Sequence, residues 1–149
     1  MSEPAWAVWH AHLLRLDRRQ CVMFCHDQTR YCLFLAGLRA AQFADLGRWH
    51  RECFTASLAK EGLDDVTIAK LELALGGLVW DARTDRSVLS SMRVAIGDFK
   101  YGLLQRSPHV LLLDPLEVSS YLNARPATIR GKWIWPRDAM KTLLSELFA

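Results

Sequence analysis

The stretch VWHAHLLRLDRRQCVMFCHDQTRYCLFL, residues 8–35, decides the fold that the sequence predicts. Residues 8–16 and 20–26 within it are both apolar and β-compatible, and the polar Asp17-Arg18-Arg19 lies between them. Two such runs around a short polar segment are typical of a β-hairpin. Asp27-Gln28-Thr29 predicts a second turn, and the run RYCLFL that follows predicts a third strand. We therefore expect a small antiparallel sheet, which needs a covered face to be stable.

The rest of the chain carries the apolar spacing of amphipathic helices. Asp64 and Asp114 are typical N-caps, and Pro115 stands at a first helical position. The short apolar run at residues 78–80 predicts a fourth strand, and Gly47 is a point where the first helical segment can break. Five helices are expected, over about residues 39–60, 64–75, 86–105, 115–123 and 136–147. The predicted fold class is α+β, with three or four antiparallel strands and about five helices.

Length and composition set the broad class. The chain has 149 residues, of which 51% are apolar and 23% charged. These fractions exclude a disordered chain, a collagen-like chain and a disulfide scaffold. The net charge of +3 permits an acidic partner without requiring one. We find no secretory signal, membrane-spanning run or lipidation motif, and so expect a cytoplasmic protein with a single domain over residues 1–149.

Two motifs carry a resemblance to a known family. The first comprises Trp9-His10, Arg18-Arg19 and Cys21, and the second Asp85-Arg86-Ser87-Val88-Leu89 with Ser91-Met92. Through them residues 9–105 resemble DUF6933, a family of small uncharacterised bacterial proteins. Arg93-Val94 departs from the Asn-Asp that members often carry there. The resemblance implies a domain of this fold class and implies no reaction or cofactor.

Histidines and cysteines gather in the predicted hairpin. His10 and His12 would share one strand face, because strand side chains alternate. A three-residue loop would place His10 opposite His26, and a two-residue loop would place His12 opposite Cys25. Imidazole and thiolate would together suit zinc. Adjacent residues 25 and 26 face opposite sides, however, and no metal-binding spacing is present, so we expect buried thiols and no metal.

The predicted helix start at Asp85 is a candidate anion site. Free backbone N–H groups and the helix dipole favour an anion there, and Arg86 would add charge. Asp85 can instead simply cap the helix, and both interpretations stay open. Together with the family motifs, this suggests a ligand pocket formed by Trp9, His10, Arg86 and Ser87.

A basic segment precedes the last helix. Arg125, Arg130 and Lys132 are interleaved there with Trp133 and Trp135. Basic and aromatic residues together suit phosphate contacts and base stacking in nucleic acid. Trp and Arg are also the favoured anchors of protein interfaces. The third alternative is that the tryptophans pack the last helix onto the core.

The sequence carries no signature of catalysis. We find no nucleophile elbow, phosphate loop or paired carboxylates, so catalytic residues stay unknown. The expected function is a non-catalytic binding or regulatory module with a protein or small-ligand interface, for which self-association as a homodimer is one arrangement. A small enzyme with a pocket between the first hairpin and the helix near Asp85 is one alternative. A weak nucleic-acid binder acting through the basic segment is the other; no cofactor and no membrane association are expected.

Overall fold

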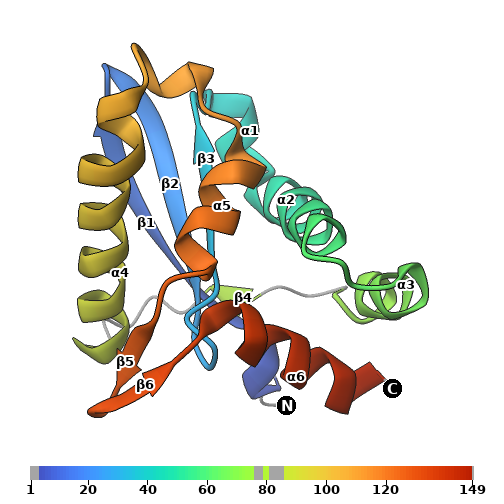
Figure 1. Ribbon diagram of the computed structural model, residues 1–149. Helices are drawn as coiled ribbons and strands as arrows, with labels where there is room; N and C mark the ends of the chain where they lie inside the picture. Colours follow the sequence, from blue (N-terminus) through green and yellow to red (C-terminus); the bar gives the residue numbers. More distant parts are fainter. Residues whose placement is uncertain (1–3, 76–78, 81–85, 149) are drawn as a thin grey trace.

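A four-stranded sheet forms the centre of the computed structural model, which describes residues 4–75, 79–80 and 86–148 (Figure 1). The strands lie in the order β3-β2-β1-β4. Strands β1, β2 and β3 are antiparallel, as the sequence predicts, whereas the short β4 pairs with β1 in parallel. Their bounds are β1 Val8–Leu16, β2 Arg19–His26, β3 Cys32–Ala36 and β4 Val79–Trp80. The predicted fourth strand also included Leu78, which lies outside the described residues.

The β1–β2 turn corrects the predicted register. Asp17 and Arg18 form a two-residue loop with φ of 48° and 62°, the backbone of a type I′ turn. Arg19, assigned to the turn from the sequence, belongs instead to β2. The two-residue loop is one of the two predicted lengths, but it places His10 opposite Cys25, so both predicted pairings, His10 with His26 and His12 with Cys25, were wrong. The sequence hid this turn because it lacks the Asn-Gly pair that usually marks one.

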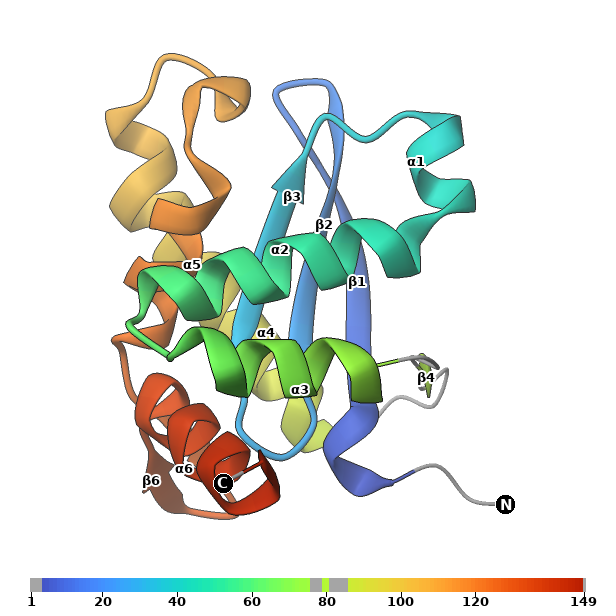
Figure 2. The ribbon, with the colours of Figure 1, turned by 90° about the vertical axis from the view of Figure 1, so that its right-hand side faces the viewer.

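Six α-helices of the described chain surround the sheet. Helices α2 and α3 cross one face (Figure 2), and α4 covers the other face (Figure 1). Helix α5 packs along the edge strand β3. The helices are α1 Ala40–Ala44, α2 Leu46–Lys60, α3 Asp65–Ala74, α4 Arg86–Asp98, α5 Pro115–Asn123 and α6 Pro136–Phe148. None of them is long and apolar enough to cross a membrane, among the residues that the structure describes.

The helix ends follow the capping residues of the sequence. The Asp64 carboxylate accepts a hydrogen bond from the Thr67 N–H at 2.8 Å, and hydrogen bonds from the Thr67 side chain and then its N–H lower the pKa of Asp64. Asp114 accepts from the Leu116 N–H at 2.9 Å in the same way. The predicted 39–60 helix breaks at Asp45, between α1 and α2, two residues before the expected glycine. The predicted cap at Asp85 lies outside the described residues.

Both faces of the sheet are covered at its centre, since every residue of β2 from Cys21 to His26 is buried, whereas Arg19 and Gln20 at the start of the strand are exposed. Val22 and Phe24 face a cluster built with α2, α3 and α6. Cys21, Met23 and Cys25 face a second cluster built with α4 and α5. This three-layer arrangement explains why β2 reads as a continuous apolar run and not as an alternating one.

A second, two-stranded sheet occupies part of the basic segment that precedes the last helix. Strands β5 Ala127–Ile129 and β6 Lys132–Ile134 pair antiparallel around Arg130-Gly131. Both turn residues have positive φ, 51° and 79°, which again defines a type I′ loop. The hairpin lies beside α4 in Figure 1, and so forms a wall next to the helix.

Candidate functional site in the groove between α4 and the β5–β6 hairpin

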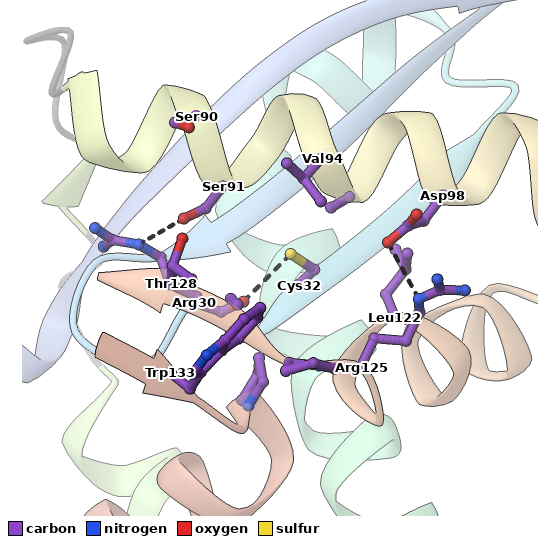
Figure 3. Close-up of a pocket in the computed structure, with 14 residues that line it drawn as sticks. Arg30, Cys32, Ser90, Ser91, Val94, Asp98, Leu122, Arg125, Thr128 and Trp133 are labelled. Carbon is purple, nitrogen blue, oxygen red and sulfur yellow. Dashed lines mark hydrogen bonds and ion pairs between the residues drawn. The ribbon is translucent and has the colours of Figure 1, made fainter. Parts of the chain in front are cut away.

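A cavity of about 180 Å³ lies between α4 and the β5–β6 hairpin (Figure 3). Cys32 of β3 and Leu122 of α5 also border it, between the helix and the hairpin. The lining residues are Arg30, Cys32, Ser90, Ser91, Val94, Ala95, Asp98, Leu122, Arg125, Pro126, Ala127, Thr128, Trp133 and Pro136. We call the space between α4 and the hairpin the α4 groove, and this cavity is its apolar part.

Arg30 is the buried cation of the α4 groove. Only 4% of the residue is exposed, and it adopts a left-handed backbone with φ of 62° at the β2–β3 turn. Its Nη2 donates to Ser87 Oγ at 2.7 Å and its Nε donates to Ser91 Oγ at 3.1 Å. Its Nη1 donates to the carbonyl oxygen of Asp27. The turn and the first two turns of α4 together hold the guanidinium in place.

Arg30 forms no ion pair with a carboxylate within the described part of the chain. None of the ion pairs there includes this side chain. Its three hydrogen bonds use neutral oxygens and three of the five guanidinium N–H groups. A buried charge without a counter-ion is costly, and hydrogen bonds offset only part of that cost. An anion beside Arg30 would therefore be stabilised by this environment.

An ion pair closes the opposite end of the cavity. Arg125 Nε lies 3.1 Å from Asp98 Oδ2 (Figure 3), and the guanidinium carbon lies 5.1 Å from the Tyr121 ring centroid. Arg125 also donates to the Tyr121 hydroxyl. A π-helical turn at Phe99–Leu103 follows Asp98, and Gly102 there packs against Tyr121. These contacts connect the end of α4 with the end of α5, and they close the cavity at this end.

Between its polar ends the cavity is mostly apolar. Val94 and Ala95 contribute from α4, and Leu122 contributes from α5. Trp133 faces α4 from the hairpin (Figure 3), and 71% of the residue is exposed. An exposed Trp beside a concave apolar surface offers a flat face on which a ligand can stack.

A second, polar cavity of about 300 Å³ adjoins the first at Arg30. Ser87 of α4 and Arg130 of the hairpin turn line it, so it continues the α4 groove toward the start of the helix. Its lining residues are Asp27, Gln28, Arg30, Ser87, Ile129 and Arg130. Asp27, its acidic member, pairs with His10 Nε2 at 2.8 Å.

The four residues predicted to form a ligand pocket are separated. Trp9 is 1% exposed and packs in the core, with its ring centroid 4.4 Å from that of His50. His10 points to the other face of the sheet and reaches the polar cavity only through Asp27. Arg86 is exposed and lines neither cavity, whereas Ser87 lines the polar one and accepts from Arg30.

The histidines and cysteines of the hairpin are not gathered into one site. His10 and Cys25 share one face of the sheet as cross-strand partners, and His26 faces the other. His26 is held there by hydrogen bonds to the Trp6 carbonyl at 2.7 Å and to Thr29 Oγ1 at 2.9 Å. His12 is exposed. The described residues contain no cluster of three metal-ligating side chains.

Two thiols of β2, those of Cys21 and Cys25, have raised pKa values. Asn123 binds both the N–H and the C=O of Cys32, so these groups make no hydrogen bonds to Cys25, its cross-strand partner. Cys32 and Cys25 therefore form a non-hydrogen-bonded pair, the kind in which the two side chains lie closest. A hydrogen bond with the Cys32 thiol, and then burial, hold the pKa of Cys25 well above its usual range. Burial likewise raises the pKa of Cys21. Neither Cys21 nor Cys25 is an activated nucleophile.

The basic segment divides into paired and unpaired residues. Arg125 is bound to Asp98. Arg130 and Lys132 are exposed and appear in none of the ion pairs of the described residues. Trp133 lines the apolar cavity, while Trp135 is 52% exposed and lies outside it.

Sequence reasoning missed Arg30, which joins two of the predicted regions. Ser87 of the predicted ligand pocket and Trp133 of the basic segment line two cavities that share this one side chain. The sequence places Arg30 before the apolar run YCLFLA, where a solvated side chain is the normal expectation. The sequence carries only a weak indication that Arg30 is buried: Ser87 and Ser91, four residues apart on one face of α4, can accept its hydrogen bonds.

The fold and the α4 groove define a class: an α+β protein with a mixed antiparallel and parallel sheet between helices, and a groove beside one of them. The chain belongs to the family described as Domain of unknown function (DUF6933), whose family model matches residues 2–139. The match includes Arg30, Ser87, Ser91 and the whole β5–β6 hairpin. A comparison with curated proteins finds no match to this sequence.

Proposed function

We propose that this protein is a non-catalytic binding module that holds a small anionic ligand in the α4 groove. The observation that carries the proposal is the Arg30 guanidinium, which is buried, bound to neutral oxygens only and shared by two cavities. Buried cations in proteins are normally paired with an anion. A ligand carboxylate or phosphate would supply that partner.

The chemistry of the groove supports binding over catalysis. Ser91 accepts from Arg30 and donates its own proton to the Ser87 carbonyl at 3.2 Å, so its hydroxyl is occupied at both functions. A nucleophile needs an adjacent base that is itself oriented. The small-enzyme alternative located between the first hairpin and α4 therefore lacks an activated group at Ser91 and Cys25.

A protein partner, or a second copy of this chain, is the second candidate. The observation that favours it is the exposure of Trp133 and Trp135, 71% and 52%, on neighbouring positions of one segment. Trp is an enriched anchor of protein interfaces. Nucleic acid is less well supported, because Arg125 is already paired with Asp98.

Four free, buried cysteines support the cytoplasm as the compartment we propose.

A thermal-shift panel with a groove-blocking variant tests the proposal. Benzoate, phenyl phosphate and inorganic phosphate are added to the wild type, to Ser90→Leu and to Ser145→Leu. Ser90 lines the apolar cavity, while Ser145 is an exposed helix serine outside the α4 groove. A ligand at about 100 times its Kd adds roughly 2.7 kcal/mol, which raises Tm by several degrees in a chain of this size.

We expect at least one of these anions to raise Tm of the wild type and of Ser145→Leu, and to raise that of Ser90→Leu much less. A flat panel on folded protein would contradict the proposal and favour the protein-partner candidate. Equal shifts in both serine variants would place the anion elsewhere on the surface.

A further inference from the structure

The two cavities of the α4 groove differ in chemistry, and this difference identifies a class of ligand. Resting on the proposed function, we infer that the ligand is a single aromatic ring that carries a phosphate or carboxylate. The ring occupies the apolar cavity beside Trp133, and the anionic group occupies the polar cavity beside Arg130. Arg30 lies where the two parts meet, because it lines both cavities.

The polar cavity suits the anionic group. Among the residues that the structure describes, two arginines, Arg30 and Arg130, and one acidic residue, Asp27, line it. Asp27 already has a partner, since His10 Nε2 lies 2.8 Å from its Oδ1. Ser87 lines the cavity and lies in the first turn of the 13-residue helix α4. The helix dipole favours a negative charge at this end of the helix. The described residues that line this cavity therefore carry more positive than negative charge.

The apolar cavity suits one aromatic ring by size and by shape. A dry cavity of about 150 Å³ in a protein core holds a benzene molecule, and this cavity measures about 180 Å³. Trp133 lines it from the hairpin and Val94 from α4 (Figure 3), so a ring placed there would lie between these two side chains. The Asp98–Arg125 ion pair closes the far end, so a long acyl chain would meet charged groups there.

The anionic group must lie at the Arg130 end of the groove. At the other end, Arg125 is bound by Asp98 and Tyr121, whereas Arg130 sits on a solvent-exposed turn and pairs with no carboxylate of the described residues. Arg130 also has the left-handed backbone, φ 51°, of a turn residue held by strand pairing. The anionic group of the ligand, which we call its head, and the aromatic ring are thus assigned to opposite ends of one groove.

Isothermal titration with three probes separates the two ends: phenyl phosphate carries both groups, inorganic phosphate the head alone and benzyl alcohol the ring alone. Benzoate is titrated in parallel to distinguish a carboxylate from a phosphate head. The variants are Arg130→Gln for the head and Trp133→Leu for the ring. Their matched controls are Lys132→Gln and Trp135→Leu, exposed residues of the same segment that line neither cavity.

We expect phenyl phosphate or benzoate to bind at least tenfold more tightly than inorganic phosphate or benzyl alcohol. Arg130→Gln should weaken binding of the aromatic anion and of inorganic phosphate by tenfold or more, the usual effect of losing a charge-assisted hydrogen bond. Trp133→Leu should weaken the aromatic anion severalfold and leave inorganic phosphate unchanged. Both control variants should bind like the wild type.

Two results would overturn this inference while leaving the proposed function in place. One is an aromatic anion that binds no more tightly than inorganic phosphate; the other is Ser90→Leu-sensitive anion binding that neither Arg130→Gln nor Trp133→Leu alters. Failure of all four probes to bind folded protein would overturn the inference and the proposed function together.

Discussion

Asn123 holds the outer edge of the sheet, and its removal should be costly. The side chain comes from α5 and is 1% exposed. Its Oδ1 accepts from the Cys32 N–H at 2.7 Å, and its Nδ2 donates to the Cys32 C=O at 2.8 Å. Because β3 is an edge strand, these two backbone groups have no neighbouring strand to pair with. The carboxamide takes the place of that strand.

Asn123→Ala leaves one buried N–H and one buried C=O without a partner. Each unsatisfied group costs about 1–3 kcal/mol, so the free energy of unfolding should fall by about 2–6 kcal/mol. In a chain of this size that loss corresponds to roughly 5–15 °C in Tm. Urea denaturation followed by tryptophan fluorescence measures the change, with the exposed α5 substitution Glu117→Gln as the control.

Asn123→Leu separates hydrogen bonding from packing, because it keeps a similar volume without either bond. We expect it to be destabilised nearly as much as Asn123→Ala. A Leu variant within about 1 kcal/mol of the wild type would refute the reasoning, since the two backbone groups would then have found other partners.

Three other properties of the fold can be tested. Burial lowers the pKa of His26 to about 4 and that of His50 to about 3. Below about pH 6.5 the unfolded chain therefore binds more protons than the folded chain. As the pH is lowered from about 6.5 to 4, the free energy of unfolding should fall by roughly 1.4 kcal/mol per pH unit for each histidine. His50→Leu should reduce that slope in urea titrations, and an unchanged slope would assign the loss to other groups. Arg18→Gly should raise stability by roughly 0.5–1 kcal/mol, because φ is 62° there and Gly adopts it without strain; a lower Tm would contradict this. Gly102→Ala should cost about 1–3 kcal/mol, because a methyl group there overlaps the Tyr121 hydroxyl, and a neutral effect in calorimetry would mean that Tyr121 moves freely.

Much of the fold could be predicted because local signals agree with the packing. The apolar runs around the first turn give the antiparallel strands, and Asp64 and Asp114 begin the helices that they were expected to cap. The hairpin at Arg130-Gly131 was missed because three-residue strands give too little periodicity to recognise. The register of the first hairpin was missed because positive φ at Asp17 and Arg18 carries no strong composition signal.

The site was harder to predict than the fold, since it depends on contacts between distant segments. Arg30 and Ser87 are 57 residues apart, and nothing in either local sequence marks their contact. Trp9 was predicted to line a ligand pocket, but its side chain faces the α2 side of the sheet. His10 is the next residue of the strand, so its side chain faces the opposite side. Burial of a charged residue is exceptional, so composition predicts Arg30 at the surface. Only the tertiary structure shows the α4 groove.

The central claim, that an aromatic anion binds beside Arg30 in the α4 groove, is tested most directly by nuclear magnetic resonance. A ¹⁵N–¹H correlation spectrum is recorded while phenyl phosphate, and then benzoate, is added to the ¹⁵N-labelled wild type. We expect saturable shifts of the Arg30 Nε–H and the Trp133 indole N–H, together with the amides of Ser91 and Thr128. Saturable shifts confined to other residues, or spectra unchanged by both probes, would contradict the claim.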